Sequence, residues 1–290
     1  MVKLDNTNTY KWTSVSDVSV KGYAYDDKNV IFTEKRLAGY FKNVKSDKDF
    51  SERLIKLNGS FAVVADFLGK IFVAVDHVRS FPMYFKLKER EIFISDQIDV
   101  NCVNNNLDFH SVLEFISAGY SIGNTTLLEN HKQLLAGQYL SYNKKTNVMS
   151  LSFYYNHNHT YTNSNNVSNH LKKLDRISDN LIKRLIGIAK DKMIVLPLSG
   201  GYDSRYIAGL LKQNNFTRVL CYTYGSLNSF EVETSKKVAK ELGFQWVFIE
   251  YNKEKWIEAL RSDLFKEYCI YASNVSSLPH IQDFIAIKEL

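Results

Sequence analysis

Seven consecutive residues, Ser199 to Arg205 (SGGYDSR), combine glycines, hydroxyl groups and a carboxylate in one short segment. They follow an apolar run, Met193–Leu198, and precede residues whose apolar members recur at helical spacing. At such a strand-to-helix junction, unpaired backbone N–H groups and the positive end of the helix dipole converge. Glycines allow the chain to turn tightly and a phosphate to approach the backbone, and the serines add donors. The segment therefore predicts a phosphate-binding loop.

Asp203 indicates which kind of phosphate loop this is. A carboxylate repels a bare phosphate, but a magnesium ion that bridges the carboxylate and a pyrophosphate removes the repulsion. The loop is not of the Walker type, because no Gly-Lys-Ser/Thr follows. We therefore expect Asp203 to hold Mg²⁺ through the pyrophosphate of ATP. The alternative is a strand-to-helix turn that binds nothing, and the full seven-residue pattern disfavours it.

The segments around this loop predict alternating strands and helices. A long amphipathic helix is expected from Val167 to Ile188, because its apolar residues recur every three or four positions. The segments that follow are a strand at Met193–Leu198, a helix with Tyr206, Ile207, Leu210 and Leu211 facing inward, a strand at Arg218–Tyr224, a helix at Glu231–Leu242 and a strand at Phe244–Tyr251. Apolar strands that alternate with amphipathic helices are typical of a parallel sheet covered on both faces.

The pattern of residues 1–155 predicts mostly strands, with one helix among them. Strands are expected at Val18–Tyr25, Ser60–Phe67, Lys70–His77, Arg90–Asp96 and on both sides of Lys144–Asn147. Leu68-Gly69 predicts a hairpin turn, and a helix is expected to begin at Asp108 and end at Gly119. The polar stretch Asn156–Asn169 predicts a linker. We therefore expect one domain at 1–155, a linker at 156–169 and a second domain at 170–290.

The composition of the chain restricts its expected partners and its expected location in the cell. The net charge of +6 is spread along the chain, which argues against a nucleic-acid partner. No apolar run approaches the ~18 residues of a membrane span, and the N-terminus is too polar for a signal peptide, so we expect a cytoplasmic protein without a membrane partner. Three scattered cysteines, Cys102, Cys221 and Cys269, fit a reducing compartment. His157 and His159 have no nearby acidic or cysteine partner and are interpreted as loop histidines rather than metal ligands.

Four segments resemble known families. LSGGYDSR, Leu198–Arg205, resembles the signature of the ATP pyrophosphatases, which cleave ATP between the α and β phosphates and leave an adenylated substrate. The run from Cys221 to Tyr251 looks like the corresponding stretch of the glutamine-dependent asparagine synthetases. Leu57–Lys86 is similar to the core of that family's glutaminase domain, and Ile116–Asn143 to the segment that joins its two domains.

This resemblance implies a two-domain fold of the α/β and α+β classes. Its N-terminal domain would be a β-rich sandwich like the Ntn glutaminases, and its C-terminal domain a parallel-sheet domain like the adenine-nucleotide α-hydrolases, with a PP-loop. ATP and Mg²⁺ would be the cofactors, and an amine or ammonia would displace AMP from a small-molecule carboxylate. The ATP site implied by the match comprises Leu198, Ser199, Gly200, Gly201, Asp203, Ser204 and Tyr224, with Leu198 and Tyr224 presenting backbone groups to adenine. Arg205 either assists the phosphates or is solvated or salt-bridged.

Two departures from the family pattern bear on activity. Glutaminases of this type use an N-terminal cysteine, whose free amine is the base for its thiol, whereas this chain begins Met1-Val2. Its first cysteine, Cys102, reads as a loop residue, so we expect no glutamine hydrolysis. Ser277–Leu290 looks like the helix that precedes the family's second pyrophosphate loop. The chain is therefore expected to be a fragment or a shortened copy, and no catalytic residue is assigned.

Several functions stay open at this point. The leading one is an asparagine-synthetase-like ligase, with aspartate or another carboxylate as substrate. The β-lactam synthetases, the macrolactam-forming enzymes and the proteins that amidate sugar acids of surface polysaccharides are similar in architecture. A tRNA-modifying ATP pyrophosphatase is a second class, disfavoured by the diffuse charge. A non-catalytic copy that at most binds ATP is the third. The oligomeric state is not predicted.

Overall fold

The computed structural model describes residues 1–6, 10–89, 91–98, 106–159 and 166–290. It divides into two compact units, one formed by Met1–His159 with Glu267–Pro279 and the other by Thr160–Lys266 with His280–Leu290. The predicted boundaries place residues 267–279 in the second domain, whereas in the structure this segment packs with the first unit.

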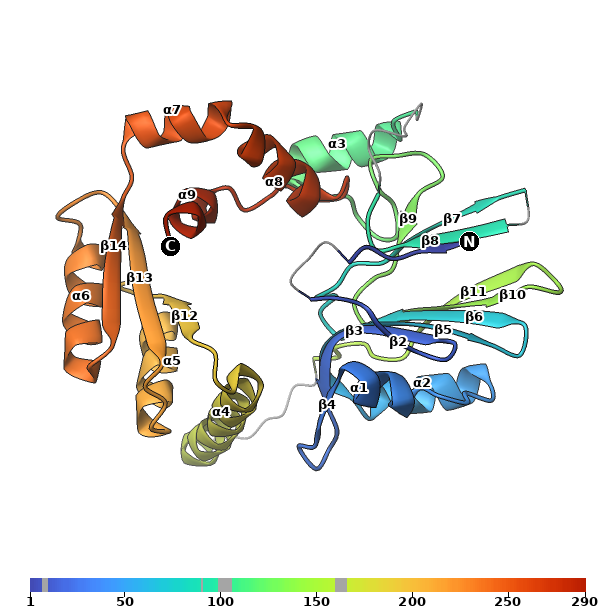
Figure 1. Ribbon diagram of the computed structural model, residues 1–290, viewed down its shortest axis with the longest axis horizontal. Coiled ribbons are helices and arrows are strands. Elements are labelled where there is room, and N and C mark those ends of the chain that lie inside the picture. The colour runs from blue at the N-terminus through green and yellow to red at the C-terminus, as the bar shows by residue number, and fades with distance from the viewer. Residues whose placement is uncertain (7–9, 90, 99–105, 160–165) are drawn as a thin grey trace. The chain divides into compact units, whose positions relative to one another are not determined.

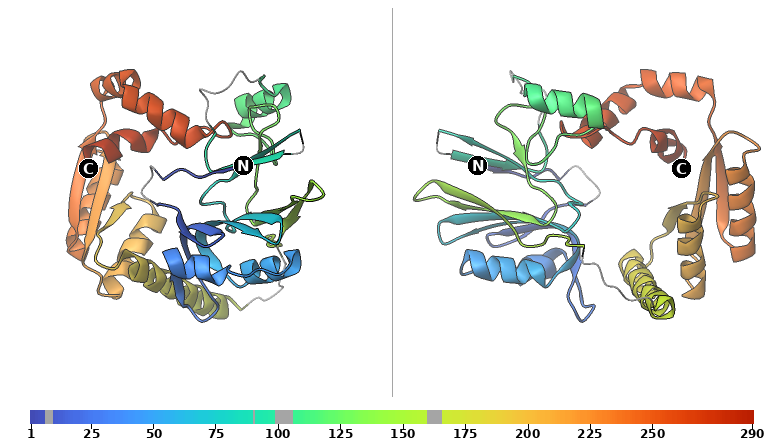
Figure 2. Two further views of the ribbon diagram at one scale, coloured as in Figure 1. Left: turned by 45° about the vertical axis from the view of Figure 1, so that its right-hand side comes forward. Right: turned by 180° about the vertical axis from the view of Figure 1, so that it is seen from behind.

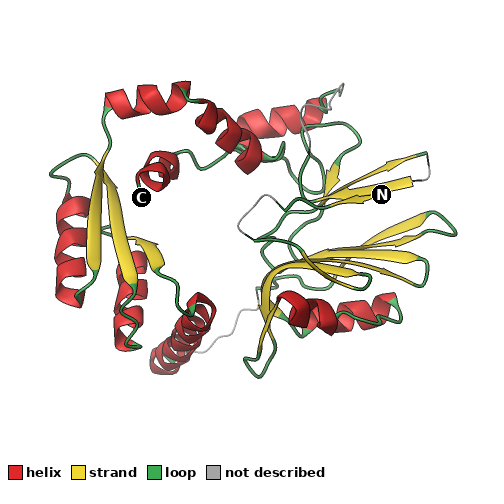
Figure 3. Cartoon of the chain, viewed as in Figure 1, coloured by secondary structure: helices red, strands yellow, loops and turns green. Residues whose placement is uncertain are grey.

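The first unit is built on two β-sheets, which Figure 3 shows in yellow. The larger sheet has the strand order β11-β10-β6-β5-β3-β2, with β4 paired to β3, and its neighbouring strands are antiparallel. The smaller sheet has the order β1-β8-β7-β9, in which β1 and β8 are parallel. The strands are β1 Val2–Lys3, β2 Thr13–Val15, β3 Val18–Tyr25, β4 Ile31–Thr33, β5 Asn58–Phe67, β6 Lys70–Val75, β7 Tyr84–Lys88, β8 Glu91–Ser95, β9 Lys132–Gln133, β10 Gln138–Asn143 and β11 Val148–Phe153.

Strand β5 carries apolar side chains at successive positions, without the usual alternation of apolar and polar residues. Phe61 and Val63 belong to one buried cluster, and Ala62 and Val64 between them belong to another. The second of these clusters also contains Ile94 of β8, so it lies between the two sheets. A strand that is buried on both faces needs apolar side chains at every position. The predicted β-rich sandwich is thus confirmed.

Two local predictions in this unit are confirmed by backbone geometry. Leu68 and Gly69 both have positive φ, 52° and 75°, which is the conformation of a two-residue hairpin turn with a matching twist. Helix α3, Phe109–Ala118, begins after Asp108, whose carboxylate accepts the Ser111 N–H at 2.8 Å. The helix ends at Gly119, which has a φ of 82°. The strand expected at Arg90–Asp96 is β8, and position 90 lies outside the described residues.

Two helices before β5 were not predicted. They are α1, Glu34–Tyr40, and α2, Asp47–Ile55, and they lie against the outer face of the larger sheet, as Figure 2 shows. Phe50 and Leu54 of α2 are fully buried one helical turn apart in the cluster that contains Phe61. Ser46 caps the helix by accepting the Asp49 N–H at 3.1 Å. This cap, followed by apolar residues four positions apart, was the available sequence signal.

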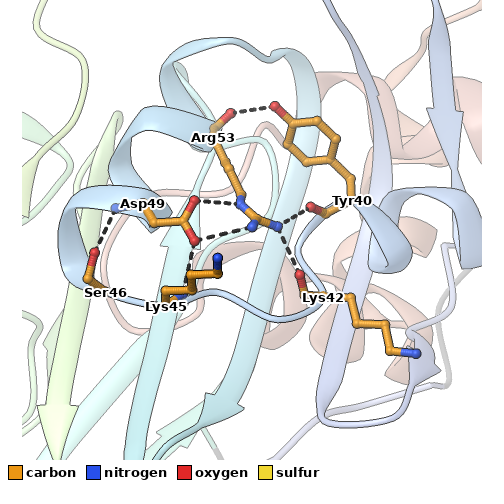
Figure 4. A network of polar contacts seen from close by, with 6 residues as sticks. All are labelled: Tyr40, Lys42, Lys45, Ser46, Asp49 and Arg53. Atoms are coloured by element: carbon orange, nitrogen blue, oxygen red, sulfur yellow. Dashed lines mark hydrogen bonds and ion pairs between the residues drawn. The ribbon is translucent and has the colours of Figure 1, made fainter.

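A single arginine connects these two helices (Figure 4). The Arg53 guanidinium donates two hydrogen bonds to the Asp49 carboxylate, at 2.9 and 3.2 Å. It also donates to the backbone carbonyls of Tyr40 and Lys42, at 2.7 and 2.9 Å. The Lys45 N–H donates at 2.9 Å to Asp49 Oδ2, which also accepts the longer of the two Arg53 bonds. Arg53 therefore satisfies carbonyl groups at the end of α1 while it is held by a side chain of α2.

Replacing Arg53 with Met is expected to lower the free energy of unfolding by about 2 kcal/mol at neutral pH. The guanidinium hydrogen bonds lower the pKa of Asp49 below its ordinary value of 3.8. A depressed pKa stabilises the fold above the pKa of the unfolded state, and this contribution is lost as the pH falls below about 4. Urea unfolding of wild type and variant should therefore differ less at pH 3 than at pH 7.

The matched control is Lys48→Met on the same helix. Lys48 pairs with Glu52 at 3.8 Å, and its side chain is 86% exposed, so its loss should cost no more than about 0.5 kcal/mol. If Arg53→Met were as stable as Lys48→Met at pH 7, the connection would not stabilise the fold.

The second unit contains a three-stranded parallel sheet of order β12-β13-β14. Its strands are β12 Ile194–Pro197, β13 Val219–Gly225 and β14 Gln245–Glu250, and the helices along the chain are α4 Val167–Ala189, α5 Tyr202–Gln213, α6 Phe230–Leu242, α7 Lys253–Arg261, α8 Asp263–Ser273 and α9 Gln282–Glu289. The strands and helices expected here are therefore present, in the expected order. Among the described residues, no helix has both the length and the apolar character needed to cross a membrane.

The helices cover the two faces of this sheet to different extents. Leu196, Cys221 and Trp246 lie side by side in register, and they pack with residues of α4, α5 and α6 in one cluster. On the opposite face, α9 contacts one end of the sheet, while Val195 and Val247 remain 46% and 40% exposed. The prediction of a sheet covered on both faces is thus confirmed in part: α4, α5 and α6 pack on one face, and α9 covers one end of the other. The chain crosses the sheet in one direction, and right-handed crossovers then place α5 and α6 on the same side.

Candidate functional site

The loop predicted to bind phosphate lies at the carboxyl end of the parallel strands. Residues Ser199–Gly201 connect β12 to α5 (Figure 1). Leu198 extends the strand by one residue, because its N–H donates to the Tyr222 carbonyl at 2.8 Å. In open sheets with parallel strands, ligands bind outside the carboxyl ends of the strands. The loop is therefore in the position where this architecture places a ligand.

The two serines of the loop lie next to each other. The Ser204 hydroxyl accepts the Ser199 N–H at 3.0 Å, and the two hydroxyl oxygens are 3.1 Å apart. The Ser199 hydroxyl also accepts the Gly201 N–H at 3.2 Å. These bonds close the loop between the strand and the first turn of the helix. The structure thus brings together Ser199, Gly201 and Ser204, which were predicted as site residues.

Helix α5 begins at this loop without a side-chain cap. Gly201 occupies the cap position and has no side chain to accept a first-turn N–H. Gly201, Tyr202 and Asp203 are all exposed. The backbone donors of the first turn and the positive end of the helix dipole are then available to an anion.

The two glycines of the loop, Gly200 and Gly201, have a different role from the tight turn that was expected of them. Gly201 has a φ of −75°, and Gly200 does not adopt positive φ either, so the turn does not depend on the left-handed conformation. A Cβ atom on Gly200 would lie 3.3 Å from the Cα of Glu231, in the first turn of α6. Gly200 therefore allows the beginning of α6 to approach the loop closely.

Asp203 lies in the first turn of α5, with an exposed side chain. Its carboxylate and the hydroxyls of Ser199 and Ser204 are oxygen donors, which is the ligand type that Mg²⁺ prefers alongside phosphate oxygens. No group of three histidine, cysteine or acidic side chains comes together as a metal site in the part of the chain that the structure describes. The donor set thus fits a magnesium ion that is bound together with a pyrophosphate, rather than one enclosed by the protein.

The two residues expected to present backbone groups to adenine lie on neighbouring strands. The Leu198 carbonyl accepts the Thr223 hydroxyl at 2.7 Å, and its N–H is bonded to β13. Its carbonyl keeps one lone pair for a ligand. Tyr224 is near the end of β13, and its ring stacks on Tyr251 with centroids 4.8 Å apart.

No local sequence signal indicated the cluster around Tyr224. The Tyr251 hydroxyl donates to the Gln282 carbonyl at 2.5 Å and accepts the Ala286 N–H at 3.1 Å, so it fixes the first turn of α9. Burial, together with the carboxylate of Asp283, raises the pKa of the Tyr224 and Tyr251 phenols to about 12. Both tyrosines are therefore protonated at neutral pH. This cluster forms through tertiary contacts, because Tyr224, Tyr251 and α9 are far apart along the chain.

Arg205 is held within its own helix turn. Its Nε donates to the Gly201 carbonyl at 2.9 Å, and its guanidinium lies 4.8 Å from the centre of the Tyr202 ring. Of the two roles considered for Arg205, these contacts favour a structural one. It stabilises the start of α5.

The remaining candidate residues are not part of this loop. His157 and His159 are exposed in the segment that follows β11, and Cys102 lies outside the described residues. In the first unit, the Met1 amine donates to the Ile92 carbonyl at 2.6 Å, as part of the β1–β8 pairing. The N-terminus is thus incorporated into a sheet.

Comparison with known proteins gives one match at the level of a family. Residues 155–269 match the family model of asparagine synthase. No curated protein has a matching sequence. Among solved structures, the chain is similar to the NH3-dependent NAD synthetase from Campylobacter jejuni subsp. jejuni NCTC 11168 in complex with the nitrate ion, at 20% identity and a TM-score of 0.28, covering 40% of this chain and 52% of that chain.

It is also similar to the glutamine phosphoribosylpyrophosphate amidotransferase from B. subtilis complexed with ADP and GMP, at 11% identity and a TM-score of 0.29, covering 86% of this chain and 52% of that one. The chain spans about half the length of these matched chains, and likenesses at such TM-scores establish neither a common fold nor a common function. The family match over 155–269 contains the whole Ser199–Arg205 loop and the strands that position it. Residues 155–269 are therefore similar to the asparagine synthase family, and this match covers less than half of the chain.

Proposed function

We propose that the second unit binds ATP with Mg²⁺ and activates a small-molecule carboxylate as an acyl-adenylate, from which an amine or ammonia displaces AMP. The observation that carries this proposal is the closed Ser199–Ser204 loop at the uncapped start of α5, within the segment that matches the asparagine synthase family. We further propose that the protein acts in the cytoplasm and that the first unit does not hydrolyse glutamine.

In the proposed reaction, the loop binds the β- and γ-phosphates, which leave together as pyrophosphate. The carboxylate oxygen of the substrate attacks the α-phosphorus, and the bond between the α-phosphorus and the bridging oxygen breaks. Backbone N–H groups of the first turn of α5 and the serine hydroxyls stabilise the negative charge that develops on the pyrophosphate. Magnesium bound with Asp203 would neutralise part of that charge. Positioning by Leu198 and Tyr224 at the adenine then holds the α-phosphorus in line with the attacking oxygen.

The experiment that tests the proposal is ATP–pyrophosphate exchange. Purified protein is incubated with ATP, Mg²⁺, labelled pyrophosphate and one carboxylate at a time, with aspartate and other amino and sugar acids as candidates. Label entering ATP only in the presence of one carboxylate supports adenylation of that compound. ATP binding without exchange for any candidate would favour the alternative, a non-catalytic copy that at most binds ATP.

Glutamine is expected not to be hydrolysed by this chain. The family's reaction uses a cysteine thiol placed beside a free amine, whereas Cys102, the first cysteine of the printed sequence, lies in an asparagine-rich segment after β8. Glutamate release from glutamine, followed with a coupled dehydrogenase, should equal the rate without protein. Release of glutamate above that rate would contradict the expectation that the chain does not hydrolyse glutamine.

A further inference from the structure

The first unit contains a cavity of about 680 Å³ that the proposed ATP site does not use. It is formed by residues of β3, of the β6–β7 connection, of the segment after β8 and of residues 271–277. Its lining includes three groups that can bind an anion, Lys21, Arg79 and the Tyr84 hydroxyl, and two aromatic walls, Phe81 and Tyr10.

A buried ion pair lies at this cavity. The side chains of Lys21 and Asp96 are 5% and 4% exposed, and their charged atoms are 3.1 Å apart. Asp96 is fully engaged, because it also accepts the Asp5 N–H and the Trp12 indole N–H, both at 2.8 Å. The Lys21 ammonium has three donors, and its hydrogen-bond acceptor among the described residues is Asp96. Lys21 therefore keeps donors for a further acceptor.

Tyr84 contributes a buried hydroxyl that the described part of the protein leaves without a hydrogen-bond partner. The residue is 2% exposed. Burial raises the pKa of its phenol, and the nearby Arg79 guanidinium and Ser276 hydroxyl oppose that rise. Arg79 and Ser276, which lie near the Tyr84 hydroxyl, line the same cavity, and the hydroxyl oxygen itself is covered in the structure. Buried hydroxyls without a partner are rare, and a ligand acceptor would satisfy this one.

Arg79 is presented to the cavity by a turn that Asp76 builds. The Asp76 carboxylate accepts the N–H groups of Val78 and Ser80, both at 2.9 Å, and its carbonyl accepts the Arg79 N–H at 3.2 Å. Arg79 has a φ of 59°, a left-handed conformation that is unfavourable for a residue with a side chain. One guanidinium nitrogen donates to the Gln133 side chain. Within the described residues, its other donors have no acceptor, so they remain available at the cavity.

We propose that this cavity binds a small organic carboxylate with a flat apolar body. The Lys21–Asp96 pair is neutral as a whole, so Arg79 leaves the lining with a net positive charge that favours an anion. A guanidinium matches a carboxylate geometrically, and the Tyr84 hydroxyl adds a neutral donor. The rings of Tyr10 and Phe81 pack edge to face with centroids 5.3 Å apart and provide an apolar wall for the body of the ligand. This inference does not depend on the proposed ATP chemistry.

The test is a fluorine NMR titration of the whole chain without ATP. The probes are 4-fluorobenzoate and 4-fluorophenylacetate, with 4-fluorobenzyl alcohol as the neutral comparison. We expect the carboxylates to bind at least about tenfold more tightly than the alcohol, since a charge-assisted hydrogen bond contributes a factor of this size. Binding of all three probes with equal affinity, or of none, would overturn the proposal.

Two variants locate the binding. Arg79→Met should weaken carboxylate binding about tenfold or more, whereas Arg176→Met, which removes an exposed arginine of α4, should leave it unchanged. Tyr84→Phe should weaken it by about threefold to tenfold without lowering the midpoint of thermal unfolding, because the hydroxyl lies near Ser276 but makes no hydrogen bond of normal geometry with it. A Tyr84→Phe protein that binds the carboxylates as well as wild type would contradict the proposed role of this hydroxyl. This variant keeps the test decisive if Arg79→Met does not fold.

Discussion

An Asp203→Asn variant is expected to lose ATP–pyrophosphate exchange by about 100-fold or more while it remains folded. The carboxylate is exposed in the first turn of α5 and has no hydrogen-bond or ion-pair partner among the described residues. Its removal should therefore cost only the favourable interaction with the helix dipole, about 0.5 kcal/mol. The loss of exchange is larger because a preorganised charge in a phosphate site typically contributes a factor of ~10²–10³ to the rate.

The measurement compares exchange rates at saturating ATP with the carboxylate that supports exchange in wild type. Glu241→Gln is the matched control, since Glu241 is an exposed acidic residue in the last turn of α6, which leads to the amino end of β14. It should keep the wild-type rate. Raising the Mg²⁺ concentration should restore part of the Asp203→Asn rate if the carboxylate acts through the metal. Equal exchange in Asp203→Asn and wild type would remove Asp203 from the proposed site.

The second large effect is expected at Asp76, in the first unit. This carboxylate is fully buried and accepts the N–H groups of Phe61, Val78 and Ser80, at 3.1, 2.9 and 2.9 Å. Asp76→Ala would leave these three donors without an acceptor in the interior. Each buried group without a partner costs about 1–3 kcal/mol, so we expect a loss of about 3–5 kcal/mol in the free energy of unfolding.

Urea unfolding at pH 7, followed by tryptophan fluorescence, measures this loss. Asp76→Asn keeps one acceptor oxygen and should fall between wild type and Asp76→Ala. Asp66→Ala is the control, because Asp66 is 46% exposed in its ion pair with Lys144 on the same sheet, and its loss should cost less than about 1 kcal/mol. A cost for Asp76→Ala no larger than that of Asp66→Ala would show that the turn does not depend on this carboxylate.

The sequence predicted the elements whose signals are local. The Leu68-Gly69 hairpin, the Asp108 cap and the Gly119 stop each depend on backbone conformations or hydrogen bonds within a few residues, and all three are present. Helices α1 and α2 were missed although Ser46 provides a local cap. Their short apolar pattern is ambiguous until the sheet surface on which they pack is known, since most of a short helix's stability comes from tertiary contacts.

In the candidate ATP site, too, contacts between near neighbours could be predicted from the sequence, whereas contacts between distant residues could not. Ser199 to Ser204 are contiguous, so their juxtaposition follows from the strand-to-helix junction alone. The contribution of Tyr251 and α9 to the surroundings of Tyr224 depends on contacts across 27 or more positions, which a single sequence does not display. The close approach of α6 to Gly200 is likewise a tertiary contact, and it explains that glycine better than the turn conformation expected for it.

The Ser199–Arg205 loop and the alternation of strands and helices from Val167 to Tyr251 were thus determined by the sequence itself, because dihedral preferences, capping and hydrophobic periodicity act between near neighbours. Only the tertiary structure decided which face of the parallel sheet the helices cover, because that depends on the direction of successive crossovers. It also brought Lys21, Arg79 and Tyr84 together from separate segments into one cavity. Such a convergence has no local signature, since it arises from strand pairing and from a turn organised by a buried carboxylate.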